Sequence, residues 1–65
     1  MPLQNSIRKF REEKSITQDQ LATAVGVSRQ TIIAMEKGNY TPSLMLAMQL
    51  AKYFKTSIEE LFRIQ

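Results

Sequence analysis

Two adjacent side chains, Arg29 and Gln30, carry the most specific hydrogen-bonding chemistry in the chain. A guanidinium group can donate two hydrogen bonds to a guanine edge, and a carboxamide can bond an adenine edge through both its donor and its acceptor. Such contacts discriminate between sequences only when a rigid element carries the side chains into a groove. The neighbouring sequence must therefore build that element and hold it in place.

Two short helices joined by one sharp turn are predicted between Thr17 and Gly38. Thr17 followed by Gln20 forms a capping box that opens the first helix. Gly26 can adopt the left-handed conformation that ends this helix, and Ser28 can cap the next one. Helical spacing predicts that the two helices face each other through Leu21, Ala22, Val25, Ile32 and Met35. The outward side of the second helix then carries Arg29, Gln30, Ile33 and Ala34.

The same residue types at the same spacing occur in a known family. The matching positions are Gln18, Ala22, Gly26, Ser28 to Ile32, Glu36 and Gly38. On these residues the stretch resembles the helix-turn-helix of the Cro/CI-like (XRE-type) repressors, and residues 11–22, 41–54 and 57–62 look like the other helices of that family. The resemblance implies an all-α, five-helix Cro/CI-type (lambda repressor-like) domain over residues 1–65, which binds double-stranded DNA with helix 29–37.

The residues expected to meet DNA fall into two groups. Base-edge contacts are expected from Arg29, Gln30, Thr31, Ile33 and Ala34. Ile33 departs from the small polar residue of many relatives and is either a base contact or a partly shielded side chain. Phosphate contacts are expected from Thr17, Gln18, Ser28, Lys37, Asn39 and Tyr40. For Lys37, Asn39 and Tyr40 an ordinary polar surface role is an equal alternative.

The first helix is predicted over about Ser6 to Glu13, with Asn5 or Ser6 as its cap. Its inner stripe is formed by Ile7 and Phe10. Arg8, Lys9 and Lys14 form either a solvated basic face or phosphate contacts. By the family resemblance, Arg11 pairs with Glu36 at the end of the recognition helix as a structural ion pair. Ile16 is placed to pack on Leu21 as a hydrophobic staple.

The C-terminal part of the sequence predicts two further helices. Ser43, or Thr41 before Pro42, caps a helix through about Phe54. Its core stripe is expected to be Leu44, Ala47, Leu50, Ala51 and Phe54, with Met45 and Met48 as gap-filling core or edge residues. Ser57 and Glu60 suggest a second capping box. Residues 1–3 and 63–65 leave room for a strand pairing. A homodimer interface is expected from Ile58, Leu61, Phe62 and Ile64.

Composition removes most other functions. The 65 residues contain no Cys and no His, so disulfides, Cys/His zinc sites and an imidazole base are absent. We expect no catalytic residues, no cofactor and no metal, because helix capping and solvation already explain the carboxylate pairs Glu12-Glu13 and Glu59-Glu60. No apolar run reaches membrane-spanning length, which predicts a cytoplasmic protein. The net charge of +3 permits a polyanionic partner. An antitoxin-like protein-interaction module that also binds DNA remains the alternative function.

Overall fold

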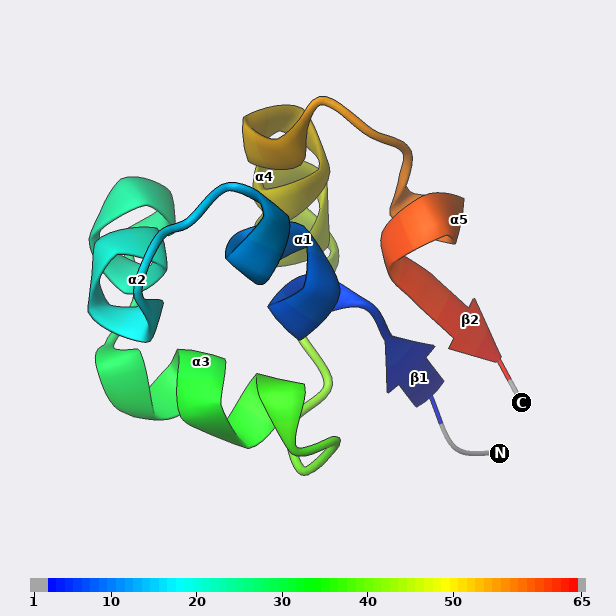
Figure 1. The fold of residues 1–65 in the computed structure, drawn as a ribbon. Coiled ribbons are helices and arrows are strands. Elements are labelled where there is room, and N and C mark those ends of the chain that lie inside the picture. Colours follow the sequence, from blue (N-terminus) through cyan, green and yellow to red (C-terminus); the bar gives the residue numbers. More distant parts are fainter. Residues whose placement is uncertain (1–2, 65) are drawn as a thin grey trace.

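The computed structural model describes residues 3–64, and these form five helices and two short strands (Figure 1). In chain order the elements are β1 Leu3–Asn5, α1 Ile7–Glu13, α2 Gln18–Val25, α3 Arg29–Glu36, α4 Leu44–Phe54, α5 Ile58–Leu61 and β2 Phe62–Ile64. The five-helix Cro/CI-like fold expected from the sequence is therefore confirmed, with a small strand pair added at the chain ends. No helix within residues 3–64 has both the length and the apolar character that crossing a membrane requires.

The predicted helix-turn-helix is formed by α2 and α3, and local capping sets its boundaries. The Oγ1 atom of Thr17 accepts from the backbone N–H of Gln20 at 3.0 Å, and the Oε1 atom of Gln20 accepts from the N–H of Thr17 at 2.8 Å. Gly26 ends α2 with φ of +76°, a left-handed conformation that suits glycine. Ser28 then caps α3 by accepting from the N–H of Thr31 at 3.2 Å. The sharp turn expected here is confirmed.

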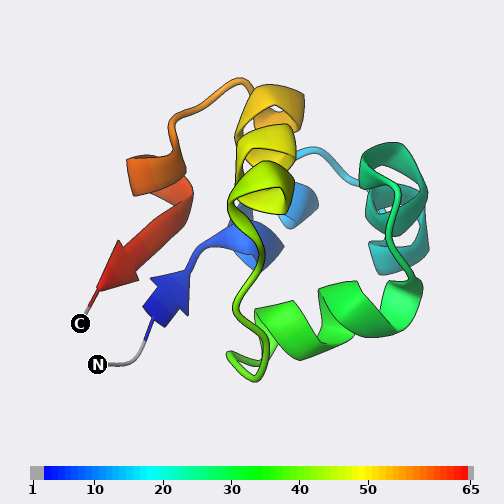
Figure 2. The ribbon, with the colours of Figure 1, turned by 180° about the vertical axis from the view of Figure 1, so that it is seen from behind.

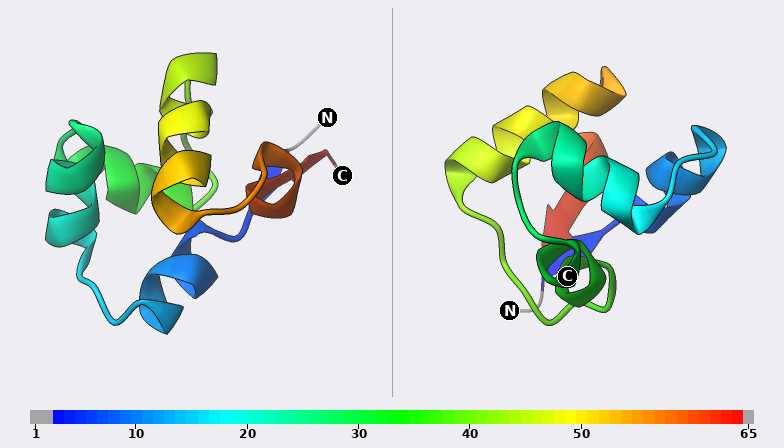
Figure 3. Two further views of the ribbon diagram at one scale, coloured as in Figure 1. Left: turned by 90° about the horizontal axis from the view of Figure 1, so that it is seen from above. Right: turned by 90° about the vertical axis from the view of Figure 1, so that its left-hand side faces the viewer.

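The core lies between α4 and the other helices. Seen from above, α4 stands between α2 on one side and α5 on the other (Figure 3). Six large side chains are almost completely buried, namely Ile7, Leu21, Ile32, Met35, Leu50 and Leu61. They come from all five helices, so one continuous core holds the helix-turn-helix to the rest of the domain.

The two chain ends meet in an antiparallel pair of strands. Leu3 lies opposite Ile64, and Asn5 lies opposite Phe62. The pairing expected at the ends of the chain therefore exists in residues 3–5 and 62–64, whereas positions 1, 2 and 65 lie outside the described residues. Just beyond β1, the N–H of Ser6 donates to the carbonyl of Leu61 at 2.8 Å, which closes α5 against the start of α1.

This closure corrects the expected dimer interface. Leu61 is completely buried and Phe62 is nearly so, both within their own protomer. For these two residues the expectation was wrong, because it treated the last turn and a half as unable to bury them without a partner and did not include the strand pair that folds the chain end onto the core. Of the four residues, Ile64 is well exposed and Ile58 is half-buried.

Four of the five residues expected in the core stripe of α4 are buried, namely Ala47, Leu50, Ala51 and Phe54. Leu44 was predicted in the core but is exposed, and Leu46 is buried in its place. Met45 and Met48, expected as core or edge residues, are more than half exposed. Nearly all positions of α4 are apolar, so periodicity alone did not determine which leucine of the first turn faces inward. The helix therefore keeps an apolar side outside the core.

The remaining helix ends follow their local sequence, except at the start of α5 and the end of α4. Ser43 caps α4 by accepting from the N–H of Leu46 at 3.1 Å, as expected. Asn5 rather than Ser6 provides the side-chain acceptor for α1, at 3.1 Å from the N–H of Ile7. Ser57 caps α5 by accepting from the N–H of Glu60 at 3.1 Å, but within residues 3–64 the Glu60 carboxylate does not accept the reciprocal bond from the N–H of Ser57, so the predicted box is incomplete. Lys55 leaves α4 with φ of +55°, a left-handed conformation that favours glycine.

Candidate nucleic-acid interface

The first turn of α3 presents its polar side chains to solvent while its other side is fixed in the core. Arg29 and Gln30 are exposed, whereas Ile32 and Met35 are completely buried. In the ribbon views α3 runs along the lower edge of the molecule, with the other helices all on one side of it (Figure 2). A helix mounted in this way can enter the DNA major groove with its N-terminal side chains leading.

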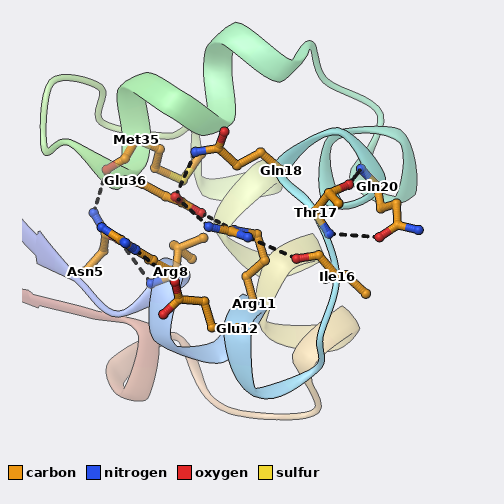
Figure 4. Close-up of polar contacts among 11 residues, drawn as sticks. Asn5, Arg8, Arg11, Glu12, Ile16, Thr17, Gln18, Gln20, Met35 and Glu36 are labelled. Carbon is orange, nitrogen blue, oxygen red and sulfur yellow. Dashed lines mark hydrogen bonds and ion pairs between the residues drawn. The ribbon is translucent and has the colours of Figure 1, made fainter.

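A polar cluster, which we name the Glu36 network, fixes the other end of α3 (Figure 4). The Glu36 carboxylate accepts from Arg11 Nε at 2.6 Å and from Arg11 Nη2 at 3.3 Å. It also accepts from Gln18 Nε2 at 3.0 Å. Arg11 Nη1 donates to the carbonyl of Ile16 at 2.9 Å. One carboxylate therefore links α1, α2 and the loop between them to the recognition helix.

The charges in this network are shielded from water. The side chains of Arg11 and Glu36 are only 13% and 6% exposed. The hydrogen bond to Glu36 is the main cause that raises the pKa of Arg11, against an opposing effect of burial. A raised pKa favours the folded state of a cation at every pH below it, so this contribution is lost only in strongly alkaline solution. The shielded pair is therefore a structural link between α1 and the end of α3.

The Gln18 side chain is not free in solvent, because it is already hydrogen-bonded within the protein. One of its amide hydrogens is already bonded to Glu36, which orients the side chain and leaves the second hydrogen available. The side chain lines a groove of about 570 Å³ together with Arg8, Ile33 and Lys37. Ile33 is half-buried in this groove, an arrangement in line with the partly shielded alternative. The sequence carried no indication of the bond between Gln18 and Glu36.

The other expected contact residues surround α3 without forming one cluster. Thr17 and Ser28 are exposed at the starts of α2 and α3, and Lys37, Asn39 and Tyr40 are exposed directly after α3. Thr31 and Ala34 are half-buried, and the hydroxyl groups of Thr31 and Ser28 lie 3.0 Å apart. Their contacts with DNA stay predictions. Residues 3–64 contain no group of three or more His, Cys, Asp or Glu side chains that could hold a metal ion.

Asn5 is a supporting residue that sequence reasoning missed. Its Nδ2 atom donates to the carbonyl of Met35 at 2.8 Å, which ties the strand pair to the C-terminal end of α3. Because its partner is a main-chain carbonyl 30 residues away, no local pattern could reveal this contact. Together with the Glu36 network it fixes α3 from two sides.

The sequence matches known transcriptional regulators over most of its length. A family model described as helix-turn-helix matches residues 7–61. An HTH-type transcriptional regulator from Methanocaldococcus jannaschii is 50% identical over 60 residues, which cover 92% of this chain and 91% of the relative. The transcriptional repressor RstR of the cryptic phage CTXphi from Vibrio cholerae is 37% identical over 57 residues, which cover 88% of this chain and 51% of the repressor.

Solved structures give the same result. The restriction-modification controller protein C.AhdI from Aeromonas hydrophila superposes with a TM-score of 0.76 at 28% identity, over 83% of this chain and 82% of the controller. A Bacteroides fragilis protein described as DNA-binding superposes with a TM-score of 0.83 at 26% identity, over 94% of this chain and 98% of the other. The chain thus belongs to the helix-turn-helix family of DNA-binding transcriptional regulators, in its Cro/CI-like (XRE-type) form.

Proposed function

We propose that this protein is a sequence-specific repressor that reads the major groove of double-stranded DNA with α3, acting as a homodimer on a pseudo-palindromic operator. The observation that carries the proposal is the mounting of Arg29 and Gln30. Both are exposed in the first turn of a helix whose opposite side is completely buried. Among its relatives, RstR is named as a repressor.

Direct readout is assigned to Arg29 and Gln30. Arg29 can donate two hydrogen bonds to guanine, and Gln30 can bond adenine through both atoms of its amide. A fixed helix limits the positions that these side chains reach, because the Glu36 network and the bond from Asn5 hold its C-terminal end. Preorganisation of this kind reduces the entropy lost when DNA binds.

Backbone positioning is assigned to residues on either side of α3. Gln18 can donate its second amide hydrogen to a phosphate at the N-terminus of α2, where the helix dipole favours an anion. Lys37 and Asn39 follow the C-terminal end of α3 and can contact the DNA backbone on the other side of the groove. These contacts orient the protein but carry no sequence information.

A dimer is expected because a two-fold axis places two recognition helices about 34 Å apart, one turn of B-DNA. The operator would then be two inverted half-sites. A repressor of this kind acts by occupying DNA that the transcription machinery requires.

Binding constants for three variants test the readout. Arg29→Ala and Gln30→Ala should each lose about 1 to 3 kcal/mol per half-site on operator DNA and much less on scrambled DNA. Lys37→Ala should weaken binding to both and reduce the slope of log affinity against log salt by about one unit. A mobility-shift titration across a salt series, with promoter DNA from beside the protein's own coding region, measures all three.

Lys55→Ala is the matched control, because Lys55 is an exposed cation at the end of α4, outside the helix-turn-helix and the groove that Lys37 lines. It should change affinity through net charge alone, and equally on both DNAs. Equal losses on operator and scrambled DNA for Arg29→Ala and Gln30→Ala would show that α3 does not read bases.

A further inference from the structure

A second apolar surface lies outside the core, on elements other than α3. Four large apolar side chains on it are more than half exposed: Leu44 at 71%, Met45 at 70%, Met48 at 55% and Ile64 at 69%. Leu3 and Ile58 are half-buried and complete the surface. We name these six residues the apolar face.

The apolar face is continuous across α4, β1, α5 and β2. Met48 lines one shallow hollow with Leu44 and Met45, and it lines a second hollow with Leu3, Ile58 and Ile64. The Met48 side chain therefore lies between the two hollows and joins them. The four most exposed side chains present on the order of 500 Å² of apolar surface, near the upper end of the largest patch on a typical monomer.

We propose that the apolar face is the surface through which two copies of this chain associate. The inference deepens the proposed function, on which it rests for the need of a dimer, and it replaces the contact that Leu61 and Phe62 were expected to make. Those two residues are buried in their own protomer, whereas Ile64 remains exposed at the edge of the new surface.

The area fits a second copy. Two faces of this size would bury on the order of 1,000 Å² together, which is the threshold for a specific protein interface, and the half-buried Leu3 and Ile58 add to it. A two-fold contact also requires a surface that is complementary to itself. An interface near this lower limit should dissociate reversibly at micromolar concentration rather than form an obligate dimer.

The charges at the edge of the apolar face also favour a second copy of this chain as the partner. Lys52 and Glu59 both line the hollow that contains Ile64. Within residues 3–64 neither of these two charges belongs to an ion pair of its own protomer. A two-fold axis through the face can therefore set Lys52 of each copy against Glu59 of the other. The surface then carries both halves of its own charge pattern, as self-association requires.

The location of the apolar face leaves α3 accessible to DNA. None of its six residues belongs to α3 or to the groove beside Gln18. Association through α4 and the strand pair therefore does not cover Arg29 or Gln30. Two copies joined in this way can present both recognition helices to one duplex.

Sedimentation equilibrium of wild type, Met48→Glu and Thr23→Glu tests the inference. Wild type should approach twice the chain mass of 7.5 kDa at high micromolar concentration. Met48→Glu buries a carboxylate twice in each dimer and should lower the association constant on the order of a hundredfold. Thr23→Glu adds the same charge at an exposed position on α2 and should behave as wild type. Equal association constants for all three proteins would overturn the inference.

Three further variants test whether the partner is a second copy of this chain and guard against misfolding. Met45→Glu, on the same helix and more exposed than Met48, should also give a monomer. Lys52→Glu should weaken the dimer several-fold by setting like charges together, and adding Glu59→Lys should restore it. Restoration by the double exchange is expected only when both partners are the same chain. A double variant as weak as Lys52→Glu alone would contradict the two-fold pairing.

The failure of this inference can be told from failure of the proposed function. A wild-type protein that remains monomeric both in solution and on promoter DNA would overturn the apolar face as a dimer surface, and the Arg29→Ala comparison would still decide whether α3 reads bases. A wild-type dimer lost in Met48→Glu, without preference for operator over scrambled DNA, would retain the interface and reject the readout.

Discussion

Replacing Glu36 with glutamine tests how far the buried charge in the Glu36 network stabilises the fold. The carboxylate accepts three hydrogen bonds from Arg11 and Gln18, and glutamine has one side-chain oxygen to replace two. If that oxygen keeps the 2.6 Å bond to Arg11 Nε, the new NH₂ group faces Arg11 Nη2 and must rely on a flipped Gln18 amide for its acceptor. The arginine then retains its charge without a hydrogen-bonded carboxylate partner.

The expected loss follows from the burial of the pair. Removing one partner of a buried ion pair costs about 3 to 5 kcal/mol, and the partial exposure of Arg11 together with the retained hydrogen bond places Glu36→Gln near the lower value. For a domain of this size about 3 kcal/mol corresponds to a fall in Tm of roughly 12 to 24 °C. Such a loss is a large part of the roughly 5 to 15 kcal/mol that stabilises a typical domain.

Thermal unfolding followed by circular dichroism measures the effect, and Glu12→Gln is the matched control. Glu12 pairs with Arg8 at 3.1 Å, but the two side chains are 55% and 71% exposed. An exposed helical pair of this kind contributes only about 0.3 to 0.5 kcal/mol. If Glu36→Gln melts within a degree or two of Glu12→Gln, the carboxylate does not stabilise the fold in the way its geometry indicates.

Three further predictions concern backbone conformation and the corrected core, each measured as a free energy of unfolding. Lys55→Gly should stabilise the domain by about 0.5 to 1 kcal/mol, because Lys55 has φ of +55° where glycine carries no strain; an unchanged or lowered stability would argue against strain there. Gly26→Ala should destabilise the domain by about 1 to 2 kcal/mol, because Gly26 has φ of +76°. Steric clash does not contribute, since no atom lies within 4 Å of the added Cβ. A neutral effect would mean that the turn relaxes. Leu61→Ala should lose about 2 to 5 kcal/mol and leave dimer affinity unchanged, because Leu61 is completely buried within one protomer; weaker association of the folded variant would return Leu61 to the interface.

The helix-turn-helix could be predicted because its signals are local. Thr17 with Gln20, Gly26 and Ser28 each specify a conformation through neighbouring backbone atoms, and the structure contains all of these features. The placement of Ile32 and Met35 in the core followed from the same helical period. Local capping and one clear apolar stripe were enough to define both helices.

The side of α4 that faces the core was predicted at Ala47, Leu50, Ala51 and Phe54 but not in its first turn. Its sequence is apolar on nearly every side, with Gln49 and Lys52 as its most polar residues, so two different stripes were compatible with the period. Leu44 stands in the first turn, where the chain arrives from α3, and tertiary packing chose Leu46 instead. The excess of apolar residues was itself the indication that this helix has a second surface to cover.

The family resemblance supplied one long-range polar contact, the Arg11–Glu36 pair, but two others were beyond the sequence. The bond from Gln18 to Glu36 joins residues 18 positions apart, and the bond from Asn5 to Met35 depends on a main-chain carbonyl. The strands are three residues each, too short for an alternating pattern to be distinguished from chance. Only the folded arrangement brings these groups together.

The same contacts bear on how a dimer would meet DNA. The Glu36 network and Asn5 fix α3 to α1, to α2 and to the strand pair, while α4 packs against α2 and against α5. The apolar face and the recognition helix therefore belong to one packed unit with no linker between them. In a dimer formed through that face, the distance between the two copies of α3 is set by core packing rather than by a flexible hinge. Spacing between half-sites then becomes part of what the protein recognises, because only DNA whose half-sites match this fixed distance can engage both helices at once.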